Sequence, residues 1–245
     1  MFEAPLFWKK KSIISLFLLP FSFFYYLGYL IYRLLKKEVE IGKPVLCIGN
    51  LVVGGAGKTP LVIKIRQLLS NDFSKIFVLT RGYLGKKKGP LIVKKTMNYE
   101  DVGDESLIHA NFGSTCVSKN KIEGAKFCKK KGADLIILDD GLQSINVKKK
   151  FSLLVIDSSY GFENRFLFPS GPLRQPTSDA LKLCDAIIIL DKTFNKKKYE
   201  FISHKRIFTG YRELKFSKNM KKKVIAFSAL GNNQNFYESL LDYKI

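Results

Sequence analysis

Paired cysteines are missing from this sequence. Its 245 residues include only four cysteines, which lie far apart and form no CxxC pair: Cys47, Cys116, Cys128 and Cys184. A chain of this length that is 46% hydrophobic can bury a sizeable core without covalent cross-links. We therefore expect neither a disulfide framework nor a cysteine–zinc site, and a reducing compartment suits the chain best.

Negative charge is also scarce. Lysine and arginine contribute 42 residues against 21 aspartates and glutamates, which gives a formal net charge of +21. A surplus of this size favours a polyanionic neighbour, namely a nucleic acid, an anionic membrane or a phosphorylated substrate. Only seven of the cations are arginine, the side chain best suited to reading bases, and the aromatic residues are densest in the N-terminal part rather than among the cations. Nucleic acid is therefore the least favoured of these partners.

One long hydrophobic run interrupts this cationic background. Residues 12–32 carry no charged side chain, and lysines or arginines lie on both sides of the run. About 20 apolar residues suffice to cross a bilayer as a helix. Because Pro20 and Gly28 break the run, a pair of short helices or a helix lying in one leaflet competes with a full span, and a buried core helix is the weaker alternative. We expect residues 1–37 to form a hydrophobic, membrane-associated N-terminal segment.

Beyond this segment, short apolar runs alternate with stretches of helical periodicity. The apolar runs are typical of buried strands, and the stretches between them are typical of amphipathic helices. Strands are expected at 44–49, 75–80, 91–93, 115–118, 134–138, 152–156 and 186–190, and helices at 60–70, 105–111 and 121–131. Apolar strands separated by helices predict an α/β fold, with a mostly parallel sheet flanked by helices on both faces.

A glycine-rich segment, GNLVVGGAGKTP, follows the first of these strands and opens the first helix. Glycines there allow backbone N–H groups to surround phosphate oxygens, and the helix N-terminus adds partial positive charge. Lys58 is expected to reach the β- and γ-phosphates of ATP, and Thr59 to ligate Mg²⁺. Val52 stands where the strict phosphate-loop pattern has glycine, and an ordinary glycine-rich connection is the alternative. The residues expected to surround the nucleotide are Val52, Val53, Gly54, Gly55, Ala56, Gly57, Lys58 and Thr59.

Two aspartates follow the apolar run LIIL, where a nucleotide site needs a carboxylate for the metal or its water. We expect Asp139 and Asp140 to serve as metal ligands together with Thr59. For one of the two, a cap on the turn before Gly141 is the alternative interpretation. Together with the glycine-rich loop, this pair predicts a P-loop NTPase-like core.

Further motifs follow in a characteristic order. After GNLVVGGAGKTP come TRGY at 80–83, GDES at 103–106, DDGLQ at 139–143, FPSGPLRQP at 168–176 and IAFSALGNNQNFYESL at 225–240. In this combination, behind an apolar and basic N-terminus, they resemble the tetraacyldisaccharide 4′-kinases, the lipid A 4′-kinase family. The resemblance implies a P-loop kinase core at 38–195 and the start of a smaller C-terminal α/β part at 196–245.

The resemblance also implies an activity and a location. Such an enzyme transfers the ATP γ-phosphoryl group to the 4′-hydroxyl of a tetraacylated glucosamine disaccharide 1-phosphate, at the cytoplasmic face of the inner membrane. Its partners are this lipid and the anionic membrane surface, and no protein partner is inferred. Asp104 occupies the position of the acid that activates the hydroxyl, and with Lys58 and Asp139 it forms the expected catalytic set. Judged without the resemblance, Asp104 is an ordinary acid at a helix start.

Two departures from the family pattern bear on this expectation. First, Gln175 stands where the family has a carboxylate expected near the metal. Second, the family's histidine that partners the acid at the position of Asp104 belongs to a stretch that would follow Ile245. The two histidines present, His109 and His204, are expected to be core or surface residues. Because general-base catalysis is worth about 10²–10⁴-fold, we expect ATP binding with phosphoryl transfer slowed by roughly that factor.

Two other functions compete with the kinase. Membrane-associated partitioning ATPases also carry GGxGKT loops, but they place a second lysine before the glycine pair, where this chain has Val53. A catalytically impaired relative that retains nucleotide and lipid binding is the other alternative.

Overall fold

A single eight-stranded sheet organises the chain in this computed structural model, which describes residues 4–54, 57–159, 161–191, 199, 202, 204–212, 237 and 240–241. The strand order is β3-β4-β2-β5-β1-β6-β7-β8, and every neighbouring pair is parallel except β3 with β4. The strands are β1 Val45–Gly49, β2 Ile76–Thr80, β3 Leu91–Ile92, β4 Thr115–Val117, β5 Leu135–Asp139, β6 Phe151–Asp157, β7 Ala186–Leu190 and β8 Arg206–Gly210.

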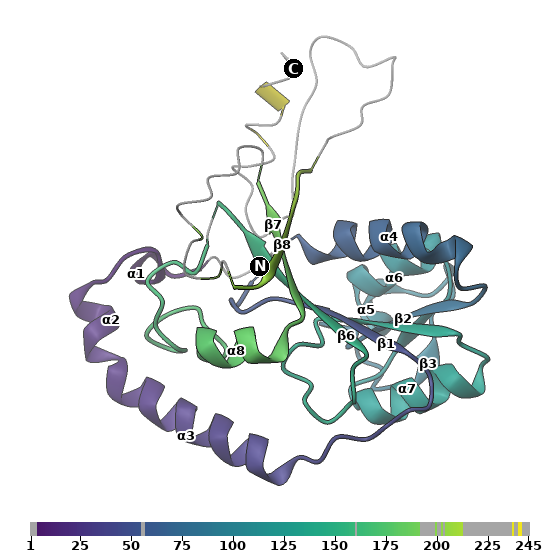
Figure 1. Ribbon diagram of the computed structural model, residues 1–245, viewed down its shortest axis with the longest axis horizontal. Coiled ribbons are helices and arrows are strands. Elements are labelled where there is room, and N and C mark those ends of the chain that lie inside the picture. The colour runs from purple at the N-terminus through teal and green to yellow at the C-terminus, as the bar shows by residue number, and fades with distance from the viewer. Residues whose placement is uncertain are drawn as a thin grey trace.

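Helices cover both faces of this sheet, as Figure 1 shows. They are α4 Lys58–Leu68, α5 Tyr99–Val102, α6 Asp104–Phe112, α7 Lys121–Lys130 and α8 Thr177–Leu183, and a 3₁₀ turn, Leu69–Asn71, extends α4. Ile65 of α4 packs on the face that carries Ile48 and Val78. Cys128 of α7 packs on the opposite face, against Leu79.

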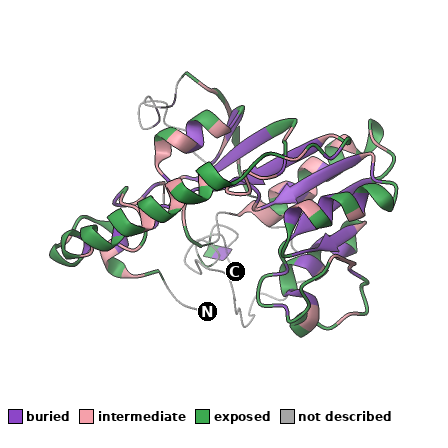
Figure 2. Ribbon diagram, turned by 90° about the horizontal axis from the view of Figure 1, so that it is seen from below, coloured by how far each residue is buried: buried purple, intermediate pink, exposed green. Residues whose placement is uncertain are grey.

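Burial on both faces explains the apolar strands. Successive side chains of a strand point to opposite faces, so a strand covered on both sides must be apolar throughout. Every residue of β1, β2 and β5 is buried, and the buried colour in Figure 2 follows the sheet. The seven strands expected from the sequence all form, with ends that differ by at most one residue. The expected parallel sheet with helices on both faces is thereby confirmed.

The N-terminal hydrophobic run folds as two helices in sequence, α2 Ile13–Phe17 and α3 Leu19–Leu35, preceded by the short α1 Leu6–Lys9. A capping box between Ser12 and Ser15 begins α2, and Pro20 lies in the first turn of α3, where its missing N–H costs nothing. No helix in the described ranges is long and apolar enough to cross a membrane.

Helices α5 and α8 and strand β8 lie outside the expected set. Helix α8 precedes β7, and β8 adds an edge strand that pairs with β7 from Ala186↔Arg206 to Leu190↔Gly210. The sheet therefore continues past residue 195, where the sequence analysis placed the end of the core. Most of the C-terminal part expected at 196–245 lies outside the described residues, and the division of the chain into parts stays a prediction.

Candidate active site

The glycine-rich loop joins the end of β1 to the start of α4 at the carboxyl edge of the sheet. Gly57 immediately precedes α4 with a φ of 64°, a left-handed conformation that glycine adopts without a Cβ penalty. Lys58 and Thr59 are the first two residues of the helix. Gly55 and Ala56, expected to surround the nucleotide, lie outside the described residues. The strand–loop–helix arrangement expected for phosphate binding is therefore present.

The first half of the loop is held by the segment that follows the FPSG motif. The Val53 N–H donates to the Pro172 carbonyl at 2.8 Å, and the Arg174 N–H donates to the Leu51 carbonyl at 2.8 Å. Val52 and Leu173 form an antiparallel bridge between the two segments. The FPSGPLRQP motif thus supports the loop from its side.

Asp140 forms the centre of an ion-pair cluster beside the loop. Its Oδ1 lies 3.4 Å from Lys58 Nζ, and its Oδ2 accepts a hydrogen bond from Arg174 Nη1 at 2.8 Å. Lys58 Nζ also donates to Oδ1 of the buried Asn50 at 3.1 Å. Burial of Asp140 disfavours its charged form, but Lys58 and Arg174 outweigh this effect and lower its pKa to about 2.

Asp139, the last residue of β5, lies one strand away from the loop, in register with Ile48 of β1. It is 3% exposed, and its Oδ2 lies 2.9 Å from Nε2 of His109, which is fully buried. Its Oδ1 is buried without a hydrogen-bond partner among the described residues. Lys121, at the start of α7, directs Nζ toward the main-chain carbonyls of Leu79 and Asp139 at 3.2 and 3.5 Å.

Helix α6 brings two further acids to the same edge. Its first residue, Asp104, is exposed, and its Oδ1 accepts the N–H of Glu105 at 2.9 Å. Thr59 Oγ1 donates to Glu105 Oε1 at 3.4 Å, which joins the start of α6 to the start of α4. Burial raises the pKa of Glu105, and the charge of Asp139 raises it further.

The structure brings most of the expected site residues together. Lys58, Thr59, Asp139 and Asp140 gather at the edge where β1 and β5 end, and Asp104 lies beside Glu105 at the rim. His109 lies in the core, as expected, whereas His204 is exposed before β8.

Three residues at this site were not among the predicted site residues. Arg174 belongs to the FPSGPLRQP motif and Glu105 to the GDES motif, so these motifs are the signal for both. No signal in the sequence links His109 to Asp139. Gln175, expected near the metal, is 1% exposed, and neither polar atom of its amide has a hydrogen-bond partner among the described residues.

A second arginine approaches the loop from the far side. Arg212 follows β8 and pairs with Asp157 at the end of β6. A Cβ placed on Gly57 would lie 2.5 Å from Arg212 Nη2, so the guanidinium occupies the space that a side chain at this position would need. Cationic groups therefore reach the loop from β8 as well as from residue 174.

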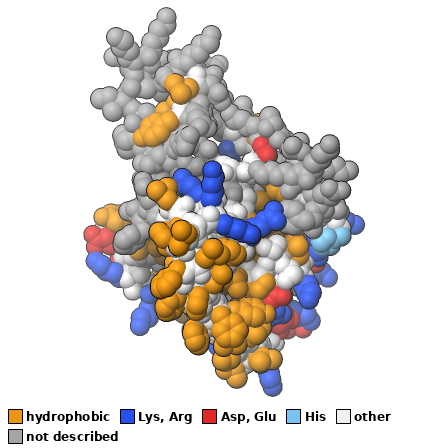
Figure 3. Space-filling model, turned by 90° about the vertical axis from the view of Figure 1, so that its left-hand side faces the viewer, with side chains coloured by type: hydrophobic (Ala, Val, Ile, Leu, Met, Phe, Trp, Pro, Cys, Tyr) orange, Lys and Arg blue, Asp and Glu red, His pale blue; other side chains and the backbone are white. Residues whose placement is uncertain are grey.

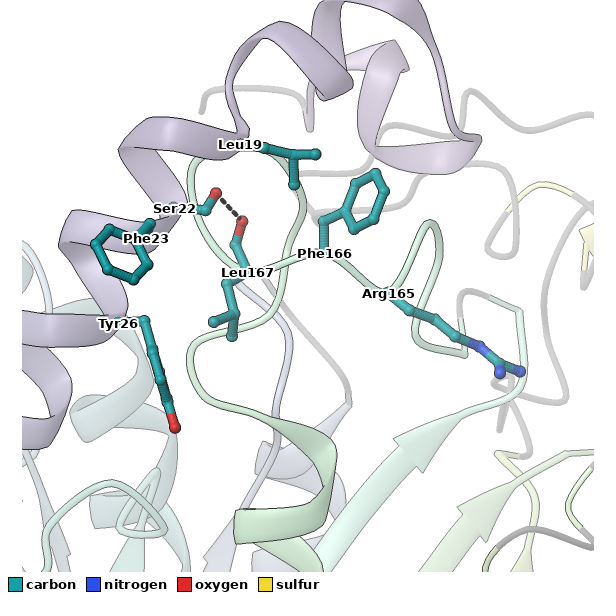
Figure 4. A pocket seen from close by; sticks show the side chains of 7 residues that line it. All are labelled: Leu19, Ser22, Phe23, Tyr26, Arg165, Phe166 and Leu167. Atoms are coloured by element: carbon teal, nitrogen blue, oxygen red, sulfur yellow. Dashed lines mark hydrogen bonds between the residues drawn. The ribbon is translucent and has the colours of Figure 1, made fainter.

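Helix α3 contacts the segment that supports the loop. Ser22 Oγ donates to the Leu167 carbonyl at 2.8 Å, and Tyr25 Oη donates to the Arg174 carbonyl at 2.8 Å. An open pocket of about 320 Å³ lies where α3 meets residues 165–167 (Figure 4). None of the residues that line it belongs to the phosphate loop, the acid pair or the start of α6.

Comparisons with known proteins agree with this arrangement. The model of the tetraacyldisaccharide-1-P 4′-kinase family, LpxK, matches residues 14–245. The tetraacyldisaccharide 4′-kinase of Bartonella quintana is 35% identical over 239 residues, which cover 95% of this chain and 69% of that protein. The enzyme of the same name from Paramagnetospirillum magneticum is 36% identical over 244 residues, which cover 97% of this chain and 74% of that protein.

A solved structure is similar over nearly the same range. The crystal structure of LpxK from Aquifex aeolicus in complex with ATP matches with a TM-score of 0.79 and 28% identity, covering 95% of this chain and 79% of that chain. A family match across most of the sequence and relatives that are more than one-third identical lead to one assignment: this chain belongs to the tetraacyldisaccharide-1-P 4′-kinase family.

Proposed function

We propose that this chain transfers the γ-phosphoryl group of ATP to the 4′-hydroxyl of a tetraacylated disaccharide 1-phosphate, a step in lipid A synthesis. Family membership supports the substrates. The observation that carries the chemistry is the cluster of Lys58, Asp140 and Arg174 against the glycine-rich loop, with Asp139 beside it. The partitioning ATPase is not favoured, because the family and the named relatives are 4′-kinases.

Phosphate binding begins with the cations. Lys58 is 11% exposed, and it is held by Asn50 and Asp140 in reach of the loop. On nucleotide binding, Lys58 shifts from Asp140 to the β- and γ-phosphates, while the backbone N–H groups at the start of α4, those of Lys58 and Thr59, face the phosphate oxygens. Arg174 stays with Asp140, so the carboxylate keeps one cation when Lys58 leaves.

The donor set at this edge fits Mg²⁺. This ion takes one or two carboxylates together with phosphate oxygens and water, and Asp139 offers a buried Oδ1 with no hydrogen-bond partner in the described part of the chain. Within that part, no group of three or more acidic, histidine or cysteine side chains could hold a metal ion. Thr59, Asp139 and Asp140 would hold Mg²⁺ with the nucleotide, and the ion supplies charge neutralisation at the phosphates.

Asp104 is proposed to accept the proton of the 4′-hydroxyl. It is exposed at the start of α6, while its neighbour Glu105 contacts Thr59. Both side chains are exposed, but the carboxylate of Glu105 is engaged by Thr59, so that of Asp104 is the one proposed to meet the lipid headgroup. Phosphoryl transfer depends on such positioning more than on covalent chemistry.

The membrane-facing surface is proposed to be the outer side of α2 and α3, at the cytoplasmic face of the inner membrane. Large apolar side chains there are strongly exposed, and Figure 3 shows them gathered on one face with lysines and arginines around them. The most exposed are Ile13, Phe17, Phe24, Leu34 and Leu35, each at least 67% accessible. A cationic rim around an apolar face suits an anionic leaflet that holds the lipid substrate.

Phosphate transfer to the lipid tests this proposal directly. The full chain in mixed micelles should transfer radiolabel from [γ-³²P]ATP to a tetraacyldisaccharide 1-phosphate. Lys58→Ala should abolish detectable transfer and weaken ATP binding, because it removes a charge-assisted phosphate contact. Asp104→Asn should leave ATP affinity within about twofold while lowering kcat by about 10² or more.

The exposed Lys64→Ala on α4 is the matched control and should behave like the wild type. Unchanged transfer in Lys58→Ala would contradict the assignment of the phosphate loop. Transfer by Asp104→Asn at the wild-type rate would show that another group, with Glu105 the first to examine, accepts the proton.

A further inference from the structure

His109 is a buried polar side chain that the proposed chemistry leaves unused. It lies on α6, one helical turn after Glu105, and it is fully buried. Its Nε2 lies 2.9 Å from Oδ2 of Asp139, and its Nδ1 has no hydrogen-bond partner among the described residues. A buried imidazole with one unsatisfied nitrogen is costly for folding, so a purely apolar residue would serve the core better.

The location of His109 excludes a direct part in proton transfer from the acceptor hydroxyl. A general base must come within hydrogen-bond reach of the proton that it takes. No surface of His109 reaches solvent, and its Nε2 already faces the carboxylate of Asp139. Any effect on the reaction must therefore pass through Asp139.

The carboxylate of Asp139 needs a hydrogen-bond partner that fixes its orientation. Two side chains of the described residues form hydrogen bonds with it: Lys121 reaches only its main-chain carbonyl, whereas His109 reaches its carboxylate. With Oδ2 held by His109, Oδ1 is the oxygen left over for a metal or its water. Groups that hydrogen-bond a metal-ligating side chain fix its orientation, and their loss typically lowers metal affinity or activity by 10–100-fold.

We propose that His109 is a positioning residue, which donates from Nε2 to Oδ2 of Asp139 and thereby holds the carboxylate in the orientation that serves Mg²⁺–ATP. This inference rests on the proposed role of Asp139 at the metal. It also ties the helix that begins with Asp104 to the end of β5, so the acid proposed for the acceptor and the acid proposed for the metal share one support.

The decisive comparison is His109→Gln against His109→Asn in the full chain. The glutamine amide nitrogen can take the place of Nε2, whereas that of asparagine ends about where Nδ1 lies and falls short of Asp139. The readout is the affinity for a fluorescent ATP analogue, measured first in EDTA and then over a Mg²⁺ titration. His109→Asn should bind the analogue in EDTA within about twofold of the wild type, but should require at least about 10-fold more Mg²⁺ for its half-maximal effect.

The Mg²⁺ concentration that His109→Gln needs for its half-maximal effect should stay within about threefold of the wild-type value. In His109→Asn, the decrease in kcat should be larger than the change in the KM for ATP. Equal Mg²⁺ dependence in the two variants would show that His109 only fills the core. Asp139→Asn separates this inference from the proposed metal site. If Asp139→Asn keeps the wild-type Mg²⁺ dependence, Asp139 has no part at the metal, and the inference about His109 falls with it.

Discussion

Asp140 holds two cations at once in a strained backbone position. Its φ is 55°, in the left-handed region that residues other than glycine seldom adopt, and its two oxygens face Lys58 and Arg174. Such strain persists where the surrounding contacts compensate for it, and it clusters at functional sites. The turn after β5 therefore aims this carboxylate at the phosphate loop at some cost in local conformational energy.

The lowered pKa of Asp140 predicts a specific acid sensitivity. Its unfolded pKa is about 3.9 and its folded pKa about 2, so the charged form stabilises the fold above about pH 4, and this contribution is lost as the pH falls towards 2. Urea unfolding measured from pH 6 to pH 2 should show a smaller loss of stability between pH 4 and pH 2 in Asp140→Asn than in the wild type. Glu123→Gln, an exposed change on α7, should follow the wild type. Superimposable curves for all three proteins would contradict the ion pairs of Asp140.

At the scale of elements, Arg66 joins α4 to the sheet and to α6. Its Nη2 donates to the Ile76 and Ser114 carbonyls at 2.8 and 3.0 Å, and its Nη1 donates to the His109 carbonyl at 3.5 Å. The side chain is 7% exposed, and burial lowers its pKa. One guanidinium thus satisfies carbonyls from three separate segments, and it fixes the helix that carries Lys58 relative to the helix that carries His109.

Arg66→Met should destabilise the protein by about 2–3 kcal/mol, because it keeps the length of the side chain but leaves buried carbonyls without donors. Lys64→Met, on the exposed side of the same helix, should change stability by less than about 0.5 kcal/mol. The free energy of unfolding in urea, measured in detergent, distinguishes the two variants. Equal stabilities for both would mean that the carbonyls around Arg66 find other partners.

Elements were predictable from the sequence where one local signal sufficed. Continuous apolar runs located seven strands, and the acids after LIIL lie at the carboxyl edge as expected. The contact between His109 and Asp139 was not predictable, because 30 residues separate them and the strand order that brings them together is not a local property. Helix α8 was missed because it is only seven residues long, too short for a clear apolar period.

At the scale of the whole molecule, α3 has its two faces reversed relative to an ordinary surface helix. Its hydroxyl and guanidinium groups point at the body of the protein, where Tyr29 and Arg33 contact Asp179 of α8 at 3.1 and 2.8 Å. Its apolar groups point outward: Phe24 and Ile31 are 67% and 56% exposed. At 3.6 residues per turn, these two groups of side chains lie on opposite sides of the helix. A surface helix of a soluble protein usually buries its apolar face, so the exposed apolar face of α3 supports the membrane contact proposed above.

The triple substitution Phe24→Ser, Ile31→Ser and Leu35→Ser should weaken binding of the protein to membranes. Each exposed apolar side chain contributes about 1.5–3 kcal/mol when buried, so the triple variant should bind vesicles of phosphatidylethanolamine and phosphatidylglycerol at least about 10-fold less in flotation assays. Binding that remains should fall with added salt, because the net charge of +21 attracts anionic lipid. Tyr25→Phe, on the face of α3 that contacts the body of the protein, should bind vesicles like the wild type. Flotation of the triple variant at the wild-type level would place the membrane contact elsewhere.

Through the hydroxyl of Tyr25, α3, which we propose to face the membrane, also takes part in the internal structure of the protein. This hydroxyl donates to the main-chain carbonyl of Arg174, whose side chain holds Asp140. The same helix therefore presents apolar side chains outward and contacts the segment that supports the phosphate loop. Ser22, Tyr25, Tyr29 and Arg33 each bond a partner on the body of the protein, so we expect these positions to tolerate substitution less well than the outward apolar ones. A foreign apolar helix in place of α3 would offer a similar outer surface, but it would lack the hydroxyl that holds the main chain at Arg174.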